Sequence, residues 1–342
     1  MAVRKRVEAW LNRCWYEGGR PGLLLSPLSL LYAGLLGLHR APWQLGLRQP
    51  VTLPVPVVVV GNITVGGTGK TPLVLWMARV LREAGWHPGI ITRGYGGTGG
   101  RHARLVTADD KAREVGDEAL LLARRAGCPV ACGPDRVADA RLLLASHGVD
   151  VIISDDGLQH LRLGRALEWV VIDGARGLGN ARLLPAGPLR ESAHRLQRVD
   201  AVVVNGEPAD SGFADALPMR LTGDTVVNLA SGEEKPLAAF SGQCLHAVAG
   251  IGNPRRFFDY LRQLADVQLH EHAFGDHYQY SSADLHFNDD APIVMTEKDA
   301  VKCADFADGR YWYLPVAADL PQAARQRLLD GLARQAGILE KA

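Results

Sequence analysis

The chain has 342 residues, which is enough for two domains of ordinary size. Its 38 basic and 37 acidic residues leave a formal net charge of +1, and this balance disfavours an extended nucleic-acid-binding surface. The five cysteines are scattered without a Cys-x-x-Cys pair, which indicates reduced structural thiols rather than a disulfide framework or a metal site.

The first fifty residues contain an almost wholly apolar run over residues 21–38, and basic residues flank it. The run is shorter than the about 20 apolar residues of a spanning helix, and Pro27 interrupts it. A secretory signal is disfavoured because Glu8 and Glu17 precede the run and no clear cleavage site follows. The flanking residues are Arg4, Lys5, Arg6, Arg13, Arg20, Arg40 and Arg48.

We therefore expect residues 1–50 to form a helix or helix pair in the headgroup region of a membrane, with the basic residues facing anionic lipid. A buried helix of a soluble core is the alternative for this segment.

From residue 51 onward, apolar runs of strand length alternate with helical stretches. The expected strands are 57–60, 87–92, 150–154, 169–172 and 201–204, and the expected helices are 71–84, 117–126 and 135–146. This alternation predicts a mostly parallel α/β sheet with helices on both faces.

The composition becomes richer in Gly, Pro, Asp and Ser around residues 206–232, where we expect a domain boundary. Beyond it come an apolar run at 245–250, strands at 292–295 and 311–314, and helices at 254–264 and from 321. The sequence thus predicts three parts: a membrane-associating segment over 1–50, a main α/β domain over 51–225, and a smaller α/β lobe over 226–342.

A glycine-rich segment, TVGGTGKT, lies between the first expected strand and the first expected helix of the main domain. In such a P-loop, backbone N–H groups surround phosphate oxygens, a lysine reaches the β- and γ-phosphates, and the next hydroxyl holds Mg²⁺. The strand–loop–helix context favours nucleotide binding over a surface turn, although threonine replaces the usual leading glycine. The expected nucleotide-binding residues are Thr64, Val65, Gly66, Gly67, Thr68, Gly69, Lys70 and Thr71.

Two carboxylates, Asp155 and Asp156, follow the buried run VIIS. In P-loop proteins, an acid at the end of a neighbouring strand binds Mg²⁺. Adjacent strand residues point to opposite faces, so we expect the two acids to differ in role, without knowing which binds the metal directly. A solvated Asp-Asp-Gly turn is the alternative.

Phosphoryl transfer to a hydroxyl also requires a group that orients the acceptor and takes its proton. Asp117 and Glu118 at an expected helix start, and His277 in the segment FGDHYQYS, are candidates. A carboxylate paired with a histidine is a common base arrangement. His270 and His272 raise a zinc alternative, but no further ligand set is evident.

Two other nucleotide-binding classes are disfavoured. A regulatory GTPase needs an Asn-Lys-x-Asp motif, and TEKD over residues 296–299 has the wrong spacing. A partition-type ATPase carries a second lysine early in its loop, where this chain has Val65. Small-molecule phosphoryl transfer is therefore favoured.

Segments in order along the chain resemble the tetraacyldisaccharide 4′-kinase family, the membrane-associated lipid A 4′-kinases of Gram-negative bacteria. They are GNITVGGTGKTP (61–72), ITRGYGG (91–97), VGDEALLLA (115–123), CGPDR (132–136), SDDGLQHLRL (154–163), VIDGARGLGN (171–180), LLPAGPLRE (183–191), GDHYQYS (275–281) and MTEKDAVK (295–302). The family's loop also has threonine at the position of Thr64.

The resemblance implies that the 51–225 domain is a P-loop kinase domain. The implied reaction transfers the γ-phosphate of ATP to the 4′-hydroxyl of an acylated glucosamine disaccharide 1-phosphate, with Mg²⁺, in lipid A biosynthesis. Asp117 and His277 would form a catalytic dyad, and Asp155 and Asp156 would handle Mg²⁺. Weaker substrate or phosphate roles are implied for Glu118, Arg136, Gln159, His160, Arg190 and Glu191.

Because Asp117 and His277 are far apart in the sequence, we expect the C-terminal lobe to close over the main domain and bring them together. The implied location is the cytoplasmic face of the bacterial inner membrane, with peripheral or monotopic attachment. Neither nucleic acid nor an obligate protein partner is expected. A soluble P-loop kinase or ligase for a small metabolite and an ATP-dependent membrane switch are the alternatives; nucleotide base, oligomeric state and acyl-chain preference stay open.

Overall fold

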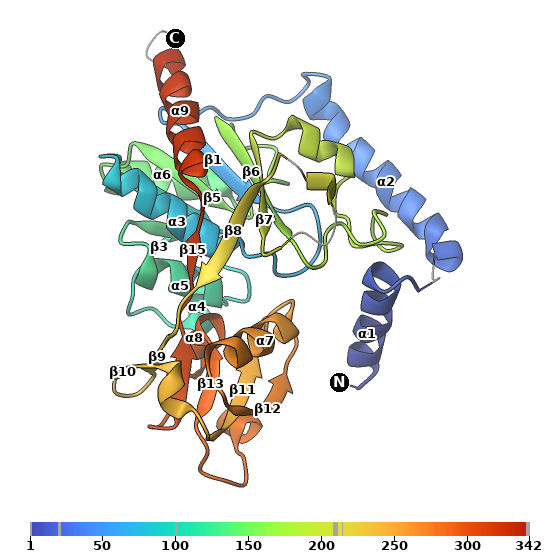
Figure 1. Ribbon diagram of the computed structural model, residues 1–342. Coiled ribbons are helices and arrows are strands. Elements are labelled where there is room, and N and C mark those ends of the chain that lie inside the picture. Colours follow the sequence, from blue (N-terminus) through green and yellow to red (C-terminus); the bar gives the residue numbers. More distant parts are fainter. Residues whose placement is uncertain (1, 20–21, 100–101, 208–210, 214, 340–342) are drawn as a thin grey trace. The chain divides into compact units, whose positions relative to one another are not determined.

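The computed structural model describes the whole chain except residues 1, 20–21, 100–101, 208–210, 214 and 340–342. The chain forms two compact units, and each is built from separate stretches of sequence. Unit 1 comprises residues 1–91, 148–220 and 320–342, and unit 2 comprises residues 92–147 and 221–319 (Figure 1). The expected division into contiguous domains, with a boundary at residue 225, stays a prediction. The compact units are each built from stretches that are separated in the sequence.

Unit 1 contains a parallel sheet whose strands lie in the order β8-β7-β6-β1-β5-β2. Its strands are β1 (Val57–Gly61), β2 (Pro88–Thr92), β5 (Val151–Asp155), β6 (Leu167–Asp173), β7 (Ala201–Asn205) and β8 (Leu217–Thr222). Strand β1 lies between β5 and β6 and is buried along its whole length. This central position explains its unbroken run of valines, because both of its faces are covered. The expected mostly parallel α/β fold is confirmed.

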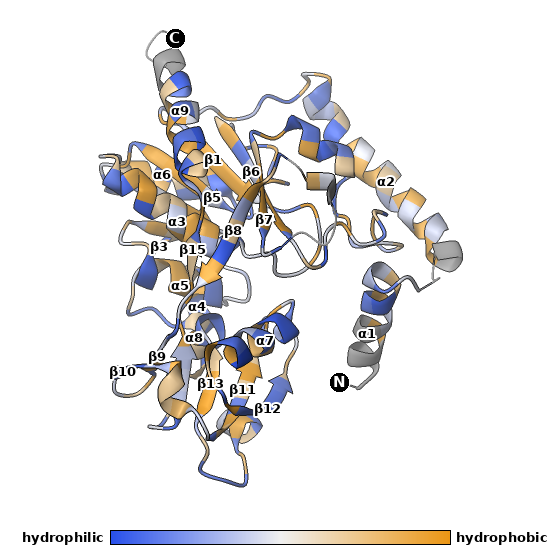
Figure 2. Cartoon of the chain, in the orientation of Figure 1, coloured by the Kyte–Doolittle hydropathy of each residue, from blue (hydrophilic) through white to orange (hydrophobic). Residues whose placement is uncertain are grey.

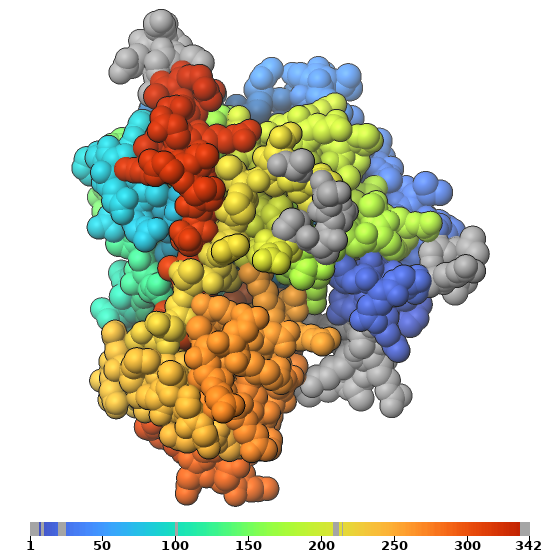
Figure 3. All heavy atoms as spheres, viewed as in Figure 1, coloured from blue at the N-terminus to red at the C-terminus, as the bar shows by residue number. Residues whose placement is uncertain are grey.

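Unit 1 also contains the helices α3 (Lys70–Glu83) and α9 (Gln322–Leu339) (Figures 1 and 3). Leu328 and Leu332 of α9 are fully buried. A Cβ at Gly331 would stand 2.9 Å from the methyl carbons of Leu167 at the start of β6, so this glycine lets the helix approach the sheet closely. The unit also contains the short 3-10 helices η1 (Ala193–Arg198) and η2 (Ser211–Phe213).

Two helices precede the sheet, α1 (Ala2–Tyr16) and α2 (Gly22–Gln44). One face of α2 contacts a loop of unit 1: the Ser29 hydroxyl donates to the carbonyl of Leu183 (2.9 Å), and the Tyr32 hydroxyl donates to the carbonyl of Arg190 (2.9 Å). The indole Nε1 of Trp15 donates to the carbonyl of Pro185 in the same loop (3.0 Å). These contacts attach both helices to one segment of unit 1.

Much of α2 is apolar (Figure 2), and apolar side chains on a different face of it are exposed. Leu28, Leu31, Leu35 and Leu38 recur at three- and four-residue spacing, and each is more than half exposed. In the described part of the chain, no helix is both long and apolar enough to cross a membrane. The expected apolar run starts at residue 21 and its flank includes residue 20; both lie outside the described residues.

Unit 2 contains a six-stranded sheet in the order β10-β9-β14-β13-β11-β12 and the antiparallel strands β3 and β4, which follow β2 in the order of the nine-stranded sheet. The strands are β3 (Arg104–Val106), β4 (Val130–Cys132), β9 (Thr225–Asn228), β10 (Glu234–Pro236), β11 (Cys244–Ala249), β12 (Gln268–Ala273), β13 (Ile293–Thr296), β14 (Tyr311–Leu314) and β15 (Ala317–Asp319). The helices are α4 (Ala112–Val115), α5 (Asp117–Arg125), α6 (Arg136–Ser146), α7 (Pro254–Leu264), α8 (Glu297–Cys303), η3 (Leu237–Phe240) and η4 (Ser282–Leu285).

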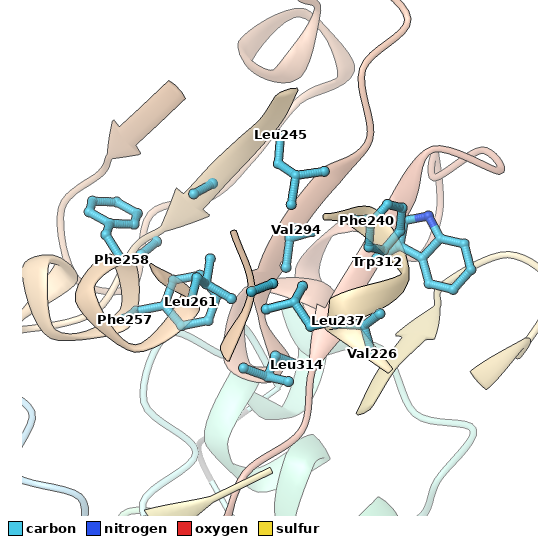
Figure 4. Packing of buried hydrophobic residues seen from close by; sticks show 13 residues of the cluster. Val226, Leu237, Phe240, Leu245, Phe257, Phe258, Leu261, Val294, Trp312 and Leu314 are labelled. Carbon is cyan, nitrogen blue, oxygen red and sulfur yellow. The ribbon is translucent and has the colours of Figure 1, made fainter. Parts of the chain in front are cut away.

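Strand β13 is buried on both faces and thereby fixes the start of α8. Val294 packs with Phe258 and Leu261 of α7 in one apolar cluster (Figure 4). Ile293 and Met295 point to the other face and pack in a second cluster. Burial of each such side chain contributes about 1.5–3 kcal/mol. The strand therefore holds α8, which carries polar side chains of the site, in a rigid position.

Candidate active site

The glycine-rich loop of unit 1 connects the end of β1 to the start of α3, as expected for a P-loop. Gly66 and Gly69 have φ angles of 103° and 95°, which residues with a Cβ rarely adopt. A Cβ at Gly69 would stand 2.2 Å from Nδ2 of Asn205, whose side-chain amide donates to the carbonyl of Thr68 (2.9 Å). Asn205 ends β7, so the sheet itself fixes the shape of the loop just before Lys70.

A second segment, residues 183–191, forms backbone hydrogen bonds with residues at the start of the phosphate loop. The amide of Val65 donates to the carbonyl of Pro188 (2.9 Å), and the amide of Arg190 donates to the carbonyl of Ile63 (2.7 Å). This is the same segment that the N-terminal helices contact. The phosphate loop is therefore held by the end of β7 and by residues 183–191, and the same residues 183–191 form hydrogen bonds with α1 and α2.

Asp155 and Asp156 occupy different environments. Asp155 is the last residue of β5 and is buried, whereas Asp156 has a φ of 49° and a side chain that is one third exposed. Asp156 Oδ1 lies 3.6 Å from Lys70 Nζ, and its Oδ2 lies 3.4 Å from Arg190 Nη1. Asp156 therefore faces Lys70 and Arg190 next to the phosphate loop, while Asp155 is buried at the carboxyl end of β5.

The residues present fit a magnesium ion. Mg²⁺ in nucleotide sites is commonly bound by one or two carboxylates together with phosphate oxygens and water. Asp155 and Asp156 supply hard oxygen ligands beside Lys70, and Thr71 supplies a hydroxyl in the first turn of α3. This chemistry suits Mg²⁺ better than a metal that prefers nitrogen or sulfur ligands.

Glu191, expected to orient a phosphate, is fully buried. Its carboxylate accepts a hydrogen bond from Gln159 Nε2 (2.6 Å) and bonds to the guanidinium of Arg40, and Arg195 Nε lies 3.5 Å away. Gln159 also donates to the carbonyl of Asn62 (3.2 Å), which precedes the phosphate loop. The buried carboxylate of Glu191 can therefore hold the side chains of Gln159 and Arg40 in position. Arg40, expected to face lipid, bonds to Glu191 instead.

His160, the neighbour of Gln159, lies in the turn after β5. Its amide donates to the carbonyl of Gly157 (3.0 Å), and its own carbonyl accepts from Arg165 Nη2 (2.5 Å). The backbone of His160 is thus part of a tight turn that follows Asp155 and Asp156 along the chain.

Asp117 and His277 form a hydrogen-bonded pair within unit 2. Asp117 is the buried first residue of α5, and its two carboxylate oxygens lie 3.2 and 3.1 Å from His277 Nδ1. His277 has a φ of 58°, a left-handed conformation that is unusual for a residue with a Cβ. The Tyr95 ring contacts the imidazole, with ring centroids 4.6 Å apart. This geometry orients the imidazole by both a carboxylate and an aromatic ring.

The expectation that closure of one lobe over the other brings Asp117 to His277 is wrong. Residues 92–147 and 221–319 fold into one compact unit, and both partners belong to it. The pair is therefore assembled by the folding of unit 2 itself.

The charges around this pair favour its ionised form. Burial alone would raise the pKa of Asp117, but the hydrogen bond from His277 and the charges of Lys298, His277 and Lys302 hold this pKa below its ordinary value. Burial would lower the pKa of His277, but the hydrogen bond to Asp117 and the carboxylates of Asp117 and Asp276 raise it, against the opposing charge of Lys298. Both shifts stabilise an ionised carboxylate that accepts a hydrogen bond from Nδ1–H.

Arg136 and Glu118, two further expected site residues, also lie in unit 2. Arg136 is buried at the start of α6, where its Nη1 donates to the carbonyl of Gly133 (3.0 Å) and lies 3.7 Å from Asp139 Oδ2. These contacts suit a structural arginine better than one that touches substrate. The Glu118 carboxylate binds Lys298 Nζ at 3.0 Å.

The histidines that raised the zinc alternative form part of a stacked cluster. His272 Nε2 lies 2.9 Å from His246 Nδ1, and His246 Nε2 lies 2.9 Å from Asp289 Oδ1. The His270 and Phe287 rings stack on His246. Across the residues that the structure describes, no group of three or more His, Cys, Asp or Glu side chains is arranged to hold a metal ion.

Sequence reasoning missed three polar residues that shape the site: Asn205, Lys298 and Arg195. Asn205 ends a strand next to β6, and a polar residue at the carboxyl end of a parallel strand could have indicated it. Lys298 lies within the segment MTEKDAVK, which entered only through the resemblance. No local pattern singles out Arg195.

Comparisons with known proteins agree with this geometry. The family model of tetraacyldisaccharide-1-P 4′-kinase, LpxK, matches residues 22–333. Among curated relatives, the tetraacyldisaccharide 4′-kinase of Alkalilimnicola ehrlichii is 54% identical over 318 residues, covering 91% of this chain and 92% of the relative. That of Nitrosococcus oceani is 48% identical over 324 residues, covering 95% and 94%.

A solved structure is also similar. It is a crystal structure of LpxK from Aquifex aeolicus, described as an "apo" form in complex with ATP. The two chains are 28% identical with a TM-score of 0.74, and the match covers 91% of this chain and 99% of that chain.

Proposed function

Because this chain belongs to the tetraacyldisaccharide-1-P 4′-kinase family, we propose that it transfers the γ-phosphate of ATP to the 4′-hydroxyl of tetraacyldisaccharide 1-phosphate. The product is the 1,4′-bisphosphate in lipid A biosynthesis. The observation that carries the proposal is the family match over residues 22–333, because it includes both the phosphate loop and the Asp117–His277 pair.

The residues of unit 1 bind the nucleotide in this proposal. Backbone N–H groups of residues 64–71 surround the phosphates, and Lys70 contacts the β- and γ-phosphates at the start of α3. Asp155, Asp156 and Thr71 would hold Mg²⁺, which when bound offsets the charge of the phosphate oxygens. Arg190, beside Asp156, supplies a second cation for the transferred phosphoryl group.

The residues of unit 2 take the proton of the acceptor. The Asp117 carboxylate accepts from Nδ1–H of His277, so the tautomer leaves Nε2 as the proton acceptor. The 4′-oxygen forms a bond to the γ-phosphorus as the bond between this phosphorus and the bridging oxygen of ADP breaks. The hydroxyl proton passes to His277 Nε2, and ADP leaves with the bridging oxygen.

The exposed apolar face of α2 supports action at a membrane surface. Leu31 and Leu38 are 61% and 72% exposed, and each exposes apolar area that water solvates poorly. An acylated substrate stays in the bilayer, because each buried CH₂ group contributes about 0.8 kcal/mol. We therefore place the enzyme at the cytoplasmic face of the bacterial inner membrane as a peripheral or monotopic protein, with α2 in the headgroup region.

The direct test follows labelled γ-phosphate from ATP to tetraacyldisaccharide 1-phosphate in detergent micelles, with Lys70→Ala as the control. The proposal predicts labelled lipid with the wild-type chain and none with the variant. Label released only as inorganic phosphate would contradict the kinase proposal and favour an ATP-dependent switch. Transfer to a small soluble metabolite but not to the lipid would favour the soluble kinase or ligase.

A further inference from the structure

A buried lysine of α8 joins the two chain segments that carry Asp117 and His277. Lys298 Nζ lies 3.0 Å from Glu118 Oε1 and 3.1 Å from Asp276 Oδ1. Its side chain is only 16% exposed, so these two carboxylates replace most of the water around the ammonium. The cation is therefore a fixed part of unit 2.

The partners of Lys298 are the immediate neighbours of the catalytic pair. Glu118 follows Asp117 at the start of α5, and Asp276 precedes His277 in the loop after β12. One ammonium group thus connects a helix start to a loop whose residue 277 has a left-handed backbone. A positive φ is uncommon for a residue with a Cβ, so this connection helps to hold His277 in that conformation.

Two further charged residues of α8, Lys302 and Asp299, connect this helix with other segments of unit 2. Lys302 Nζ lies 2.7 Å from Asp299 Oδ1 and 4.0 Å from Asp117 Oδ2. Asp299 Oδ2 accepts from Thr296 Oγ1 (2.6 Å) and from the amide of Gly250 (2.8 Å). The helix that presents Lys298 is therefore attached to strand ends of the sheet, so the position of the ammonium is determined by the fold.

The charge of Lys298 acts on both members of the pair in the same direction. It lowers the pKa of Asp117 and opposes the rise in the pKa of His277. Burial would lower the pKa of Lys298 itself, but Glu118, Asp117 and Asp276 raise it above its ordinary value, so the ammonium stays charged at neutral pH.

We propose that Lys298 is a positioning residue for the phosphoryl transfer, because its ammonium links Glu118 to Asp276 and thereby sets the distance between the Asp117 carboxylate and the His277 imidazole. This inference rests on the kinase function proposed above. A misplaced base loses much of its effect even when substrate binding is intact. The role therefore predicts a loss in kcat rather than in nucleotide affinity.

The test compares Lys298→Met with Lys298→Arg and with a matched control, Lys111→Met. Lys111 also belongs to unit 2, and its ion pair with Asp305 is longer (3.6 Å) and exposed. Initial rates of lipid phosphorylation are measured as a function of pH, together with the ATP dissociation constant and the melting temperature.

We expect Lys298→Met to lower kcat by at least about tenfold with an unchanged ATP dissociation constant, which is the signature of a misplaced group in the transition state. Loss of the cation raises the pKa of both Asp117 and His277, so the acidic limb of the kcat/KM profile moves to higher pH. Lys298→Arg keeps the charge and restores the position of that limb. Lys111→Met behaves as wild type.

Asp276→Asn provides a second variant if Lys298→Met fails to fold, because it leaves the buried cation paired with Glu118. It is expected to lower kcat without changing ATP binding. Wild-type kcat and an unshifted pH profile in a folded Lys298→Met, or wild-type kcat in Asp276→Asn where the former does not fold, would overturn the inference. Failure of the wild-type chain to phosphorylate the lipid would instead refute the kinase function.

Discussion

Replacement of Gly69 by alanine tests how strongly the fold constrains the phosphate loop. Gly69 has a φ of 95° directly before Lys70, and a Cβ there would stand 2.2 Å from Asn205 Nδ2 and 3.3 Å from the Met219 methyl carbon. The substitution therefore combines an unfavourable backbone conformation with a collision against the side chain that fixes the loop.

The expected cost follows from these two contributions. A left-handed backbone costs a residue with a Cβ about 1–2 kcal/mol, and overpacking of a tight site costs about 1–3 kcal/mol. Together they amount to about 2–5 kcal/mol. The loop can avoid this strain only by giving up the geometry in which its amides face the phosphates. Since about 1.4 kcal/mol corresponds to a factor of ten, the ATP dissociation constant should rise by at least about 30-fold.

Calorimetric titration with ATP measures this effect, and Gly85→Ala is the matched control. Gly85 follows the other end of α3 and has a φ of 88°, but a Cβ there would meet no atom within 4 Å. Gly85→Ala should lower the free energy of unfolding only through the cost of a left-handed backbone, and it should keep the wild-type ATP dissociation constant. Wild-type ATP affinity in Gly69→Ala would refute the idea that Asn205 and the left-handed backbone hold the loop in its binding conformation.

Three further predictions concern the rest of the chain. Glu191→Gln removes the buried carboxylate that pairs with Arg40, so it should destabilise the protein by about 3 kcal/mol and lower its melting temperature, whereas the exposed Glu83→Gln should change it little. Leu38→Asp should reduce sedimentation with anionic vesicles, and unchanged binding would contradict the proposed contact of α2 with lipid. Asp117→Ala and His277→Ala should each lower single-turnover phosphorylation strongly, while the double variant loses little more; fully additive losses would show that the two groups act independently.

The sequence predicts those parts of the fold and site that depend on local pattern. The valine run of β1, the glycines after it and Lys70 are contiguous, so the strand–loop–helix arrangement is readable directly. The alternation of strand side chains also predicted that Asp155 and Asp156 would differ, and one is buried while the other faces Lys70.

Other features depend on contacts between distant segments, which local pattern does not encode. Periodicity shows that a strand is buried, but not which segment covers it, so the union of residues 92–147 with 221–319 could not be foreseen. The assembly of Asp117 with His277 inside one unit follows from that union. For the same reason Arg40 was expected at a lipid surface, although it bonds to a carboxylate 151 residues further along the chain.

The most direct test of the kinase proposal is to locate the new phosphate on the product. The full chain is incubated with ATP and tetraacyldisaccharide 1-phosphate, and the purified lipid is examined by phosphorus–proton correlation NMR. We predict a second phosphorus signal correlated with the proton at the 4′ position, formed in equal amount with ADP. A phosphate at any other position, or ADP formed without phosphorylated lipid, would contradict the proposal.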